Sequence, residues 1–215
     1  MRAARSAWTM SGLFITFEGV EGCGKSTQVA RLRDRMEALG HTVVNTREPG
    51  GTVISESIRA ILLNPENVAI TPVTELLLYA AARAQHVDAL IRPSLDAGAV
   101  VICDRFADST TAYQGAGRNL DPAMIQRMHD AATRGTWPDI TILLDLPAET
   151  GLARARTVRT LDRIEQEPLA FHRAVRDEFL NIAANEPERV RVLDATLSED
   201  AVAEAIWQFV APRLP

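Results

Sequence analysis

The chain has 215 residues, 47% of them hydrophobic and 24% charged, which is typical of one globular domain and excludes a disordered or fibrous chain. Its net charge of −5 argues against a nucleic-acid partner, and no apolar run approaches the roughly 18 residues of a membrane span. The two cysteines and four histidines show neither a disulfide framework nor metal-ligand spacing, so we expect a cytoplasmic protein whose ligands are small molecules.

The chain begins with the basic stretch MRAARSAWTM, which has no apolar segment behind it and therefore does not resemble a secretory signal. We interpret residues 1–11 as a flexible N-terminal extension, and the sequence leaves open whether translation starts at Met1 or Met10. Residues 12–215 contain no repeat, low-complexity tract or linker, which predicts a single domain.

Strands and helices are expected to alternate from residue 13 onward. Apolar runs predict buried strands over residues 13–18, 99–104 and 139–146, and residues 41–46 and 189–195 are interpreted as two further strands. Helical spacing of apolar residues predicts helices over residues 25–39, 53–63, 71–91, 121–134 and 198–210, and another around residues 171–182. This alternation is the pattern of βαβ units. It predicts an α/β fold with a parallel five-stranded sheet and helices on both faces.

The first predicted strand leads into GVEGCGKS, residues 19–26, which matches the phosphate-loop pattern G-x-x-x-x-G-K-[ST]. Glycines let backbone N–H groups turn toward phosphate oxygens, and the following helix N-terminus adds partial positive charge. Lys25 is expected to reach the β- and γ-phosphates of ATP, and the Ser26 hydroxyl to hold Mg²⁺. The loop therefore predicts a nucleotide-binding site.

Charged side chains are expected at the ends of several strands. Ligands of such sheets bind at the carboxyl ends of the strands, so Glu18, Arg47 and Asp104 should converge on one edge. Asp104 and Arg105 close a buried strand together, and two charges are costly there unless they are used or paired. This edge is the expected place of the active site.

Tyr79 and Arg83 stand four residues apart on one predicted helix and therefore share a face. An aromatic ring beside a guanidinium suits the recognition of a planar base. Spacing alone is equally consistent with a core tyrosine beside a surface arginine.

Four arginines, at positions 154, 156, 159 and 163, lie within ten residues after the strand at 139–146. A run of charges is usually a solvated helix face. Here it follows a strand at the ligand edge, so we interpret residues 150–165 as a lid. Arginines that arrive when a lid closes would neutralise transition-state charge while water is excluded.

The motifs FEGVEG, TREPGGT, YAAARAQH, DRFADSTTAYQGAGR and LDRIEQE occur in this order along the chain. In this set and order the chain resembles the thymidylate kinase family over nearly its whole length after the first eleven residues. Gly22 stands where some types carry a phosphate-loop arginine, which is similar to the bacterial type with the catalytic arginine in its lid. The resemblance implies a P-loop fold like that of nucleoside monophosphate kinases, the reaction dTMP + ATP → dTDP + ADP with Mg²⁺, and a homodimer.

The resemblance also implies roles for individual residues. Arg47 and Arg105 would clamp the dTMP phosphate, and Tyr113 would lie near the deoxyribose beside Glu21. The catalytic set would be Lys25, Arg105, Arg156, Arg159 and Glu21, with the choice between the two lid arginines left open. ATP would contact Gly19, Val20, Glu21, Gly22, Cys23, Gly24, Lys25, Ser26, Thr27 and Arg154. The dTMP set would be Glu18, Arg47, Pro49, Tyr79, Arg83, Arg105, Thr110, Thr111, Tyr113 and Gln114. The metal would be held near Ser26, Asp104 and Glu21.

Two other functions stay open at this point. Another pyrimidine monophosphate kinase is one, because a methyl-sized pocket distinguishes thymine from uracil only about 10–200-fold. A non-catalytic ATP-dependent regulator is the other. It needs no clamp for a phosphate acceptor, so the Asp104-Arg105 pair and the lid arginines speak against it.

Overall fold

The computed structural model describes residues 12–158 and 160–214. The predicted extension of residues 1–11 and the candidate lid residue Arg159 lie outside the described residues. Within the described part, no helix is both long and apolar enough to cross a membrane.

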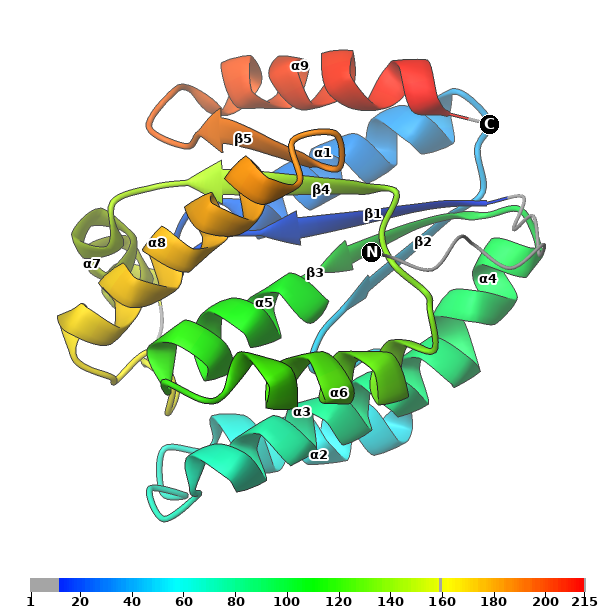
Figure 1. The fold of residues 1–215 in the computed structure, drawn as a ribbon. Coiled ribbons are helices and arrows are strands. Elements are labelled where there is room, and N and C mark those ends of the chain that lie inside the picture. Colours follow the sequence, from blue (N-terminus) through cyan, green and yellow to red (C-terminus); the bar gives the residue numbers. More distant parts are fainter. Residues whose placement is uncertain (1–11, 159, 215) are drawn as a thin grey trace.

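The described chain forms the predicted five-stranded parallel sheet, in the order β2-β3-β1-β4-β5 (Figure 1). Its strands are β1 (Leu13–Glu18), β2 (Val43–Arg47), β3 (Val100–Asp104), β4 (Ile140–Asp145) and β5 (Val190–Asp194). The α-helices are α1 (Lys25–Ala38), α2 (Val53–Leu63), α3 (Pro72–His86), α4 (Arg92–Asp96), α5 (Ala107–Thr110), α6 (Pro122–Thr133), α7 (Ala148–Val158), α8 (Leu169–Asn185) and α9 (Glu199–Val210). Three further turns are the π-helical η1 (Val87–Ile91) and η2 (Thr111–Gly117) and the 3₁₀-helical η3 (Ala211–Arg213).

Helices cover both faces of the sheet because alternate strand residues point to opposite sides (Figure 1). Ile15 and Phe17 of β1 pack in the core formed with α1 and α9. Phe14, the residue before Ile15, packs on the other face with η1 and α4. All three side chains are fully buried, so β1 lies at the centre of the fold with both faces covered.

The strand register brings the expected charged residues to one edge. Asp104 at the end of β3 stands opposite Phe17 of β1 on one side and Arg47 of β2 on the other. Glu18, the last residue of β1, is followed directly by the phosphate loop. Three strand ends and the loop therefore meet at a single place.

Residues 107–118 are more regular than their hydroxyl-rich sequence indicates, since they form α5 and η2. The reason is a tertiary contact. The Glu18 carboxylate accepts hydrogen bonds from the backbone N–H groups of Phe106 (2.8 Å) and Ser109 (3.3 Å), at the start of α5. Such N–H groups have no partner inside a helix, so a carboxylate from a distant strand stabilises a turn that local sequence does not predict.

The helix expected over residues 71–91 divides into α3 and the wider turn η1, and α4 continues it to Asp96. Pro93 lacks an N–H group, and its ring crowds the carbonyl four residues earlier, which disfavours an uninterrupted α-helix at this point. The backbone N–H of Arg92 accordingly donates to the carbonyl of Val87, five residues back.

Candidate active site

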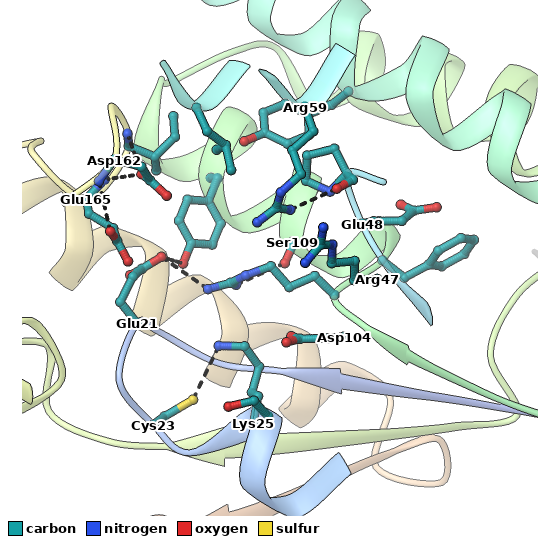
Figure 2. Close-up of a pocket in the computed structure, with 18 of the residues that line it drawn as sticks. Glu21, Cys23, Lys25, Arg47, Glu48, Arg59, Asp104, Ser109, Asp162 and Glu165 are labelled. Carbon is teal, nitrogen blue, oxygen red and sulfur yellow. Dashed lines mark hydrogen bonds and ion pairs between the residues drawn. The ribbon is translucent and has the colours of Figure 1, made fainter. Parts of the chain in front are cut away.

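A cavity of about 380 Å³ opens at the carboxyl ends of β1, β2 and β3. Figure 2 shows acidic and basic side chains from distant parts of the chain gathered around it. One part of its wall is the phosphate loop, and the opposite part comes from α2, α3 and the α5–η2 segment. The predicted site residues on this wall are Glu21, Gly22, Cys23, Gly24, Lys25, Ser26, Arg47, Pro49, Tyr79, Arg83, Asp104, Arg105, Thr110, Tyr113, Gln114 and Arg154.

The phosphate loop is shaped by glycines with left-handed backbones, Gly22 at φ 65° and Gly24 at φ 92°. The Lys25 ammonium group donates to the carbonyl oxygens of Gly19 (3.1 Å) and Val20 (3.0 Å) and so spans the loop. These are neutral partners. An anionic phosphate would compete for the same ammonium through charge-assisted hydrogen bonds.

The loop packs against the start of α7 backbone to backbone. A Cβ atom at Gly22 would come within 2.3 Å of the Gly151 carbonyl oxygen, and one at Gly151 within 2.2 Å of the Glu21 carbonyl oxygen. Neither position has room for a side chain, so this arrangement leaves no place for an arginine at residue 22. Any cation for the phosphates besides Lys25 must therefore come from another element.

Glu21 is the centre of a buried charge cluster. Its Oε1 atom accepts hydrogen bonds from the Tyr113 hydroxyl (2.5 Å) and from Nη2 of Arg105 (3.1 Å). His172 Nδ1 lies 3.4 Å from the other carboxylate oxygen. Burial alone would raise the pKa of Glu21, but His172, Arg105, Lys25 and Tyr113 together outweigh burial and hold that pKa well below its usual range. Glu21 is therefore a carboxylate at neutral pH.

Arg105 has an unusual backbone. Its φ of 70° is left-handed, which is rare for a residue with a side chain and costs about 1 kcal/mol. Two contacts hold it there: the Arg105 N–H donates to the Phe17 carbonyl at 2.9 Å, and the Cys103 thiol donates to the Arg105 carbonyl at 3.0 Å. The guanidinium group lies 5.0 Å from the centre of the Tyr113 ring and bridges the two halves of the cavity.

Asp104 is the side chain whose environment indicates a metal site. Its Oδ1 atom is buried and has no hydrogen-bond partner among the described residues. Within residues 12–158 and 160–214, no group of three acidic, histidine or cysteine side chains is placed to hold a metal by itself. Both facts fit Mg²⁺, which keeps several waters and is held through one or two carboxylates together with substrate phosphates.

The far end of the cavity is suited to a planar base. Arg83 of α3 and Gln114 of η2 both line the cavity there. The amide nitrogen of Gln114 donates to Glu75 Oε1 at 2.9 Å, which fixes the orientation of the amide. Tyr79, on α3, lines the cavity, and burial together with Glu75 raises the pKa of its hydroxyl, so the ring stays neutral. Neutral aromatic surface and fixed donors are what base recognition requires.

Comparison with known proteins identifies the family that this chain resembles over most of its length. The family model for thymidylate kinase matches residues 17–206. The thymidylate kinase of Geobacter sulfurreducens is 52% identical over 210 residues, which cover 95% of this chain and 99% of the relative. That of Syntrophotalea carbinolica is 51% identical over 200 residues, with 90% and 93% covered. The crystal structure of thymidylate kinase from Ehrlichia chaffeensis superposes with a TM-score of 0.77 at 33% identity, covering 93% of this chain and 98% of that one.

The chain belongs to the thymidylate kinase family. The resemblance drawn from the ordered motifs is thereby confirmed, and so is the P-loop, nucleoside monophosphate kinase-like fold. Family membership also decides against the non-catalytic regulator.

Some predicted site residues do not line the cavity of this thymidylate kinase family member. Gly19, Val20 and Thr27 lie in or beside the phosphate loop but outside the wall, and Arg156 is exposed on α7. Thr111 faces α6, where its hydroxyl lies 2.9 Å from His129 Nε2.

Two further residues have structural partners in place of a cavity contact. Glu18 is buried and holds the start of α5, as described above. Arg163, counted in the lid from sequence, is buried and donates to Glu75 Oε2 at 2.6 Å and to the Leu62 carbonyl at 2.7 Å. It therefore fixes the C-terminal end of the lid segment to α3.

Sequence reasoning missed several residues of the wall, namely Glu48, Arg59, Leu63, Phe106, Ser109, Ala155, Asp162, Ile164 and Glu165. Glu48 belongs to the TREPGGT motif, and Asp162 and Glu165 to LDRIEQE, so the motifs themselves were the available signal. Arg59 had no local signal. It reaches the cavity because α2 packs over the turn after β2, where Arg59 donates to the Pro49 carbonyl at 2.8 Å.

Glu18 makes a testable contribution to stability. Burial, followed by the nearby Asp108 charge, raises its pKa from 4.5 to about 7. The folded state thus favours the protonated carboxyl, and this contribution is present below pH 4.5 and lost as the pH rises through about 7. We expect the free energy of unfolding to fall by about 3 kcal/mol relative to Glu18→Gln over that interval. Urea unfolding of both proteins from pH 4.5 to 8 measures the difference, and parallel pH curves would contradict it.

Proposed function

We propose that ATP occupies the phosphate-loop end of the cavity, that dTMP occupies the base-recognition end, and that the phosphoryl group passes between them beside Arg105. The reaction is that of the thymidylate kinase family, the phosphorylation of dTMP to dTDP with ATP as donor. One observation carries the assignment of the two ends: a single cavity joins the phosphate loop to Tyr79 and Arg83, with Arg105 between them.

At the ATP end, Lys25 leaves its carbonyl partners for the β- and γ-phosphates, and the backbone N–H groups of residues 19–27 surround the phosphate oxygens. Mg²⁺ would be held by the Ser26 hydroxyl, by Asp104 and by Glu21. When bound, it neutralises phosphate charge. The unpartnered oxygen of Asp104 supports this assignment. Arg154, which lines the cavity from α7, would contact ATP.

At the dTMP end, the arginines around the cavity hold the acceptor phosphate. Arg105 approaches it from β3 and Arg47 from β2, and Arg59 adds a third cation. In the described structure Arg47 pairs with Glu56 at 3.1 Å, a half-exposed contact that a phosphate can displace. Tyr113, held by Glu21, lies against the deoxyribose and restricts the space for a 2′-hydroxyl.

The base contacts follow from the same wall. Tyr79 lies on the thymine ring, and Arg83 donates to its edge, while Thr110, Gln114 and Pro49 complete the pocket.

The chemistry requires positioning and positive charge more than proton transfer. The acceptor phosphate is already a nucleophile at neutral pH, so no strong general base is needed. Two anionic groups must approach in line, and cations fixed around them lower the repulsion. The lid over residues 150–165 would bring its arginine to the transferring group and exclude water.

An acceptor screen tests this function. We expect ADP release with Mg²⁺·ATP to be fastest with dTMP, about 10–200-fold slower with dUMP, and slower still with UMP, CMP and AMP. A coupled ADP-release assay across these five nucleotides measures the preference. Equal rates with dTMP and UMP would contradict the base and sugar assignments while leaving ATP binding intact.

We also propose a cytoplasmic homodimer. Large apolar side chains on α2 and α3 are exposed, among them Val53 (84%), Ile54 (55%) and Leu77 (50%), and such a patch is typical of an interface between two copies. Sedimentation that detects only single chains at assay concentration would contradict the dimer, and recovery in the membrane fraction of cells would contradict the location.

A further inference from the structure

Beyond the residues that touch the nucleotides, we infer that Glu48 and His86 orient the guanidinium of Arg83. By fixing its direction, they set a preference for a base that presents a carbonyl oxygen to Arg83 over a base that presents an amino group. This inference rests on the proposed base contact of Arg83. It assigns Glu48 and His86 as positioning residues, which act through Arg83 and not on the reacting atoms.

Arg83 lines the cavity, yet its side chain is only 2% exposed, so its direction is fixed by its neighbours. Nε donates to Glu48 Oε2 at 2.7 Å, Nη1 to the Thr110 hydroxyl at 2.9 Å, and Nη2 to the Phe106 carbonyl at 3.0 Å. A guanidinium has five N–H groups and accepts no hydrogen bond. Three are used by these partners, which leaves one on each terminal nitrogen for a ligand.

The second carboxylate oxygen of Glu48 is hydrogen-bonded to His86. His86 Nδ1 lies 3.0 Å from Glu48 Oε1, and because a carboxylate oxygen accepts, the ring nitrogen donates. His86 Nε2 lies 2.7 Å from the Thr46 hydroxyl of β2. His86 is fully buried, and Glu48 is 3% exposed (Figure 2 labels Glu48 at the cavity). A chain of contacts therefore runs from β2 through His86 and Glu48 to Arg83.

The surrounding backbone is fitted to this chain of contacts. A Cβ atom at Gly51, whose φ is 82°, would come within 2.4 Å of His86 Nε2 and 2.5 Å of the Thr46 hydroxyl oxygen. The glycine of the TREPGGT turn thus makes room for the His86–Thr46 contact. His86 and Thr46 do not line the cavity, so direct contact with a nucleotide does not explain their arrangement.

The chemical consequence is selectivity at one edge of the base. Two fixed N–H donors match a carbonyl oxygen and are opposed by an amino group, which also donates. A site that leaves a polar partner unpaired rejects the wrong ligand far more strongly than a shape difference does. That discrimination depends on the guanidinium being unable to turn aside, which is what a salt bridge to an immobilised carboxylate provides.

The test compares variants by kcat, KM for dTMP, and the ratio of kcat/KM for dTMP to that for dCMP. Glu48→Gln is expected to raise KM about 10–100-fold with kcat changed less than threefold, and to lower the dTMP/dCMP ratio at least 10-fold. His86→Asn keeps a donor near the Nδ1 position and should stay within threefold of wild type in KM and in the ratio. His86→Gln, which places its amide toward Thr46, should behave like Glu48→Gln.

His129→Asn is the matched control. His129 is also a buried histidine bonded to a threonine hydroxyl, but it does not line the cavity. It should lower the melting temperature and leave KM and the ratio within twofold. If Glu48→Gln does not fold, the comparison of His86→Asn with His86→Gln decides whether the positioning role is correct.

Arg83→Lys separates this inference from the function on which it rests. If Arg83→Lys collapses the dTMP/dCMP ratio while Glu48→Gln and His86→Gln leave KM and the ratio within threefold, the positioning role is wrong and the base contact of Arg83 stands. If Arg83→Lys leaves the ratio unchanged, the base contact itself is wrong. Equal behaviour of His86→Asn and His86→Gln, with effects on melting temperature alone, would also overturn the inference.

Discussion

Replacing Arg105 by methionine is expected to lower kcat/KM for dTMP by about 10²–10³-fold, because one side chain contributes in two ways. Its guanidinium is proposed to clamp the acceptor phosphate, and it also donates to Glu21 at 3.1 Å. Without it, a buried carboxylate loses a cation that helps to keep its pKa low. Glu21 would then repel the approaching phosphate or take up a proton and lose its hold on Tyr113.

Steady-state kinetics with dTMP and ATP varied separately measure this effect. KM for ATP should change less than threefold, since Lys25 and the phosphate loop remain. Glu21→Ala should show the same division, with dTMP turnover impaired far more than ATP binding. Arg134→Met is a matched control, because Arg134 also has a left-handed backbone (φ 51°) and an acidic partner, Asp88 at 2.8 Å, but lies exposed. A fall of less than fivefold for Arg105→Met would contradict the clamp.

Alanine at the catalytic lid arginine is expected to lower kcat by about 10³–10⁵-fold, the amount that an arginine delivered to a transferring phosphoryl group contributes. The candidates are Arg156 and Arg159. Arg156 is exposed on α7 outside the cavity wall, so it can act only if the segment moves when nucleotides bind. Arg159 lies outside the described residues. KM for ATP should change little, since the interaction forms in the transition state.

Single-turnover measurements of Arg156→Ala, Arg159→Ala and the double variant identify which arginine acts. Arg173→Ala serves as control, because Arg173 is an exposed arginine beside α7 that pairs with Glu149. The lid hypothesis fails if both single variants and the double variant keep kcat within about threefold of wild type.

The positions of the strands and of the phosphate loop followed from local patterns. The five predicted strands are present with ends shifted by no more than two residues. The continuous apolar runs of β1, β3 and β4 were the clearest signal, because such runs are stable only where both faces are covered. The loop was recognised because glycine spacing, lysine and flanking elements are all local properties. Strand ends likewise placed Arg47 and Asp104 at the ligand edge, where the register sets them opposite each other.

What local pattern could not give was the direction in which side chains point. Arg163 and Arg154 belong to one charge run, yet Arg163 is buried on Glu75 while Arg154 lines the cavity. Thr110 and Thr111 are neighbours, but only Thr110 lines the cavity, and Thr111 contacts α6. In each pair the residue type is the same, and the packing of neighbouring elements decides the role.

The sequence by itself therefore determined the fold class, the nucleotide loop, the ordered motifs of the thymidylate kinase family, and the strand ends that carry charge. Only the tertiary structure decided the contacts between distant residues: Glu21 with Tyr113, Glu18 with the start of α5, and Glu48 with both Arg83 and His86. The physical reason is that buried charges must find partners wherever packing places them. Those partners lie between 35 and 92 residues away along the chain.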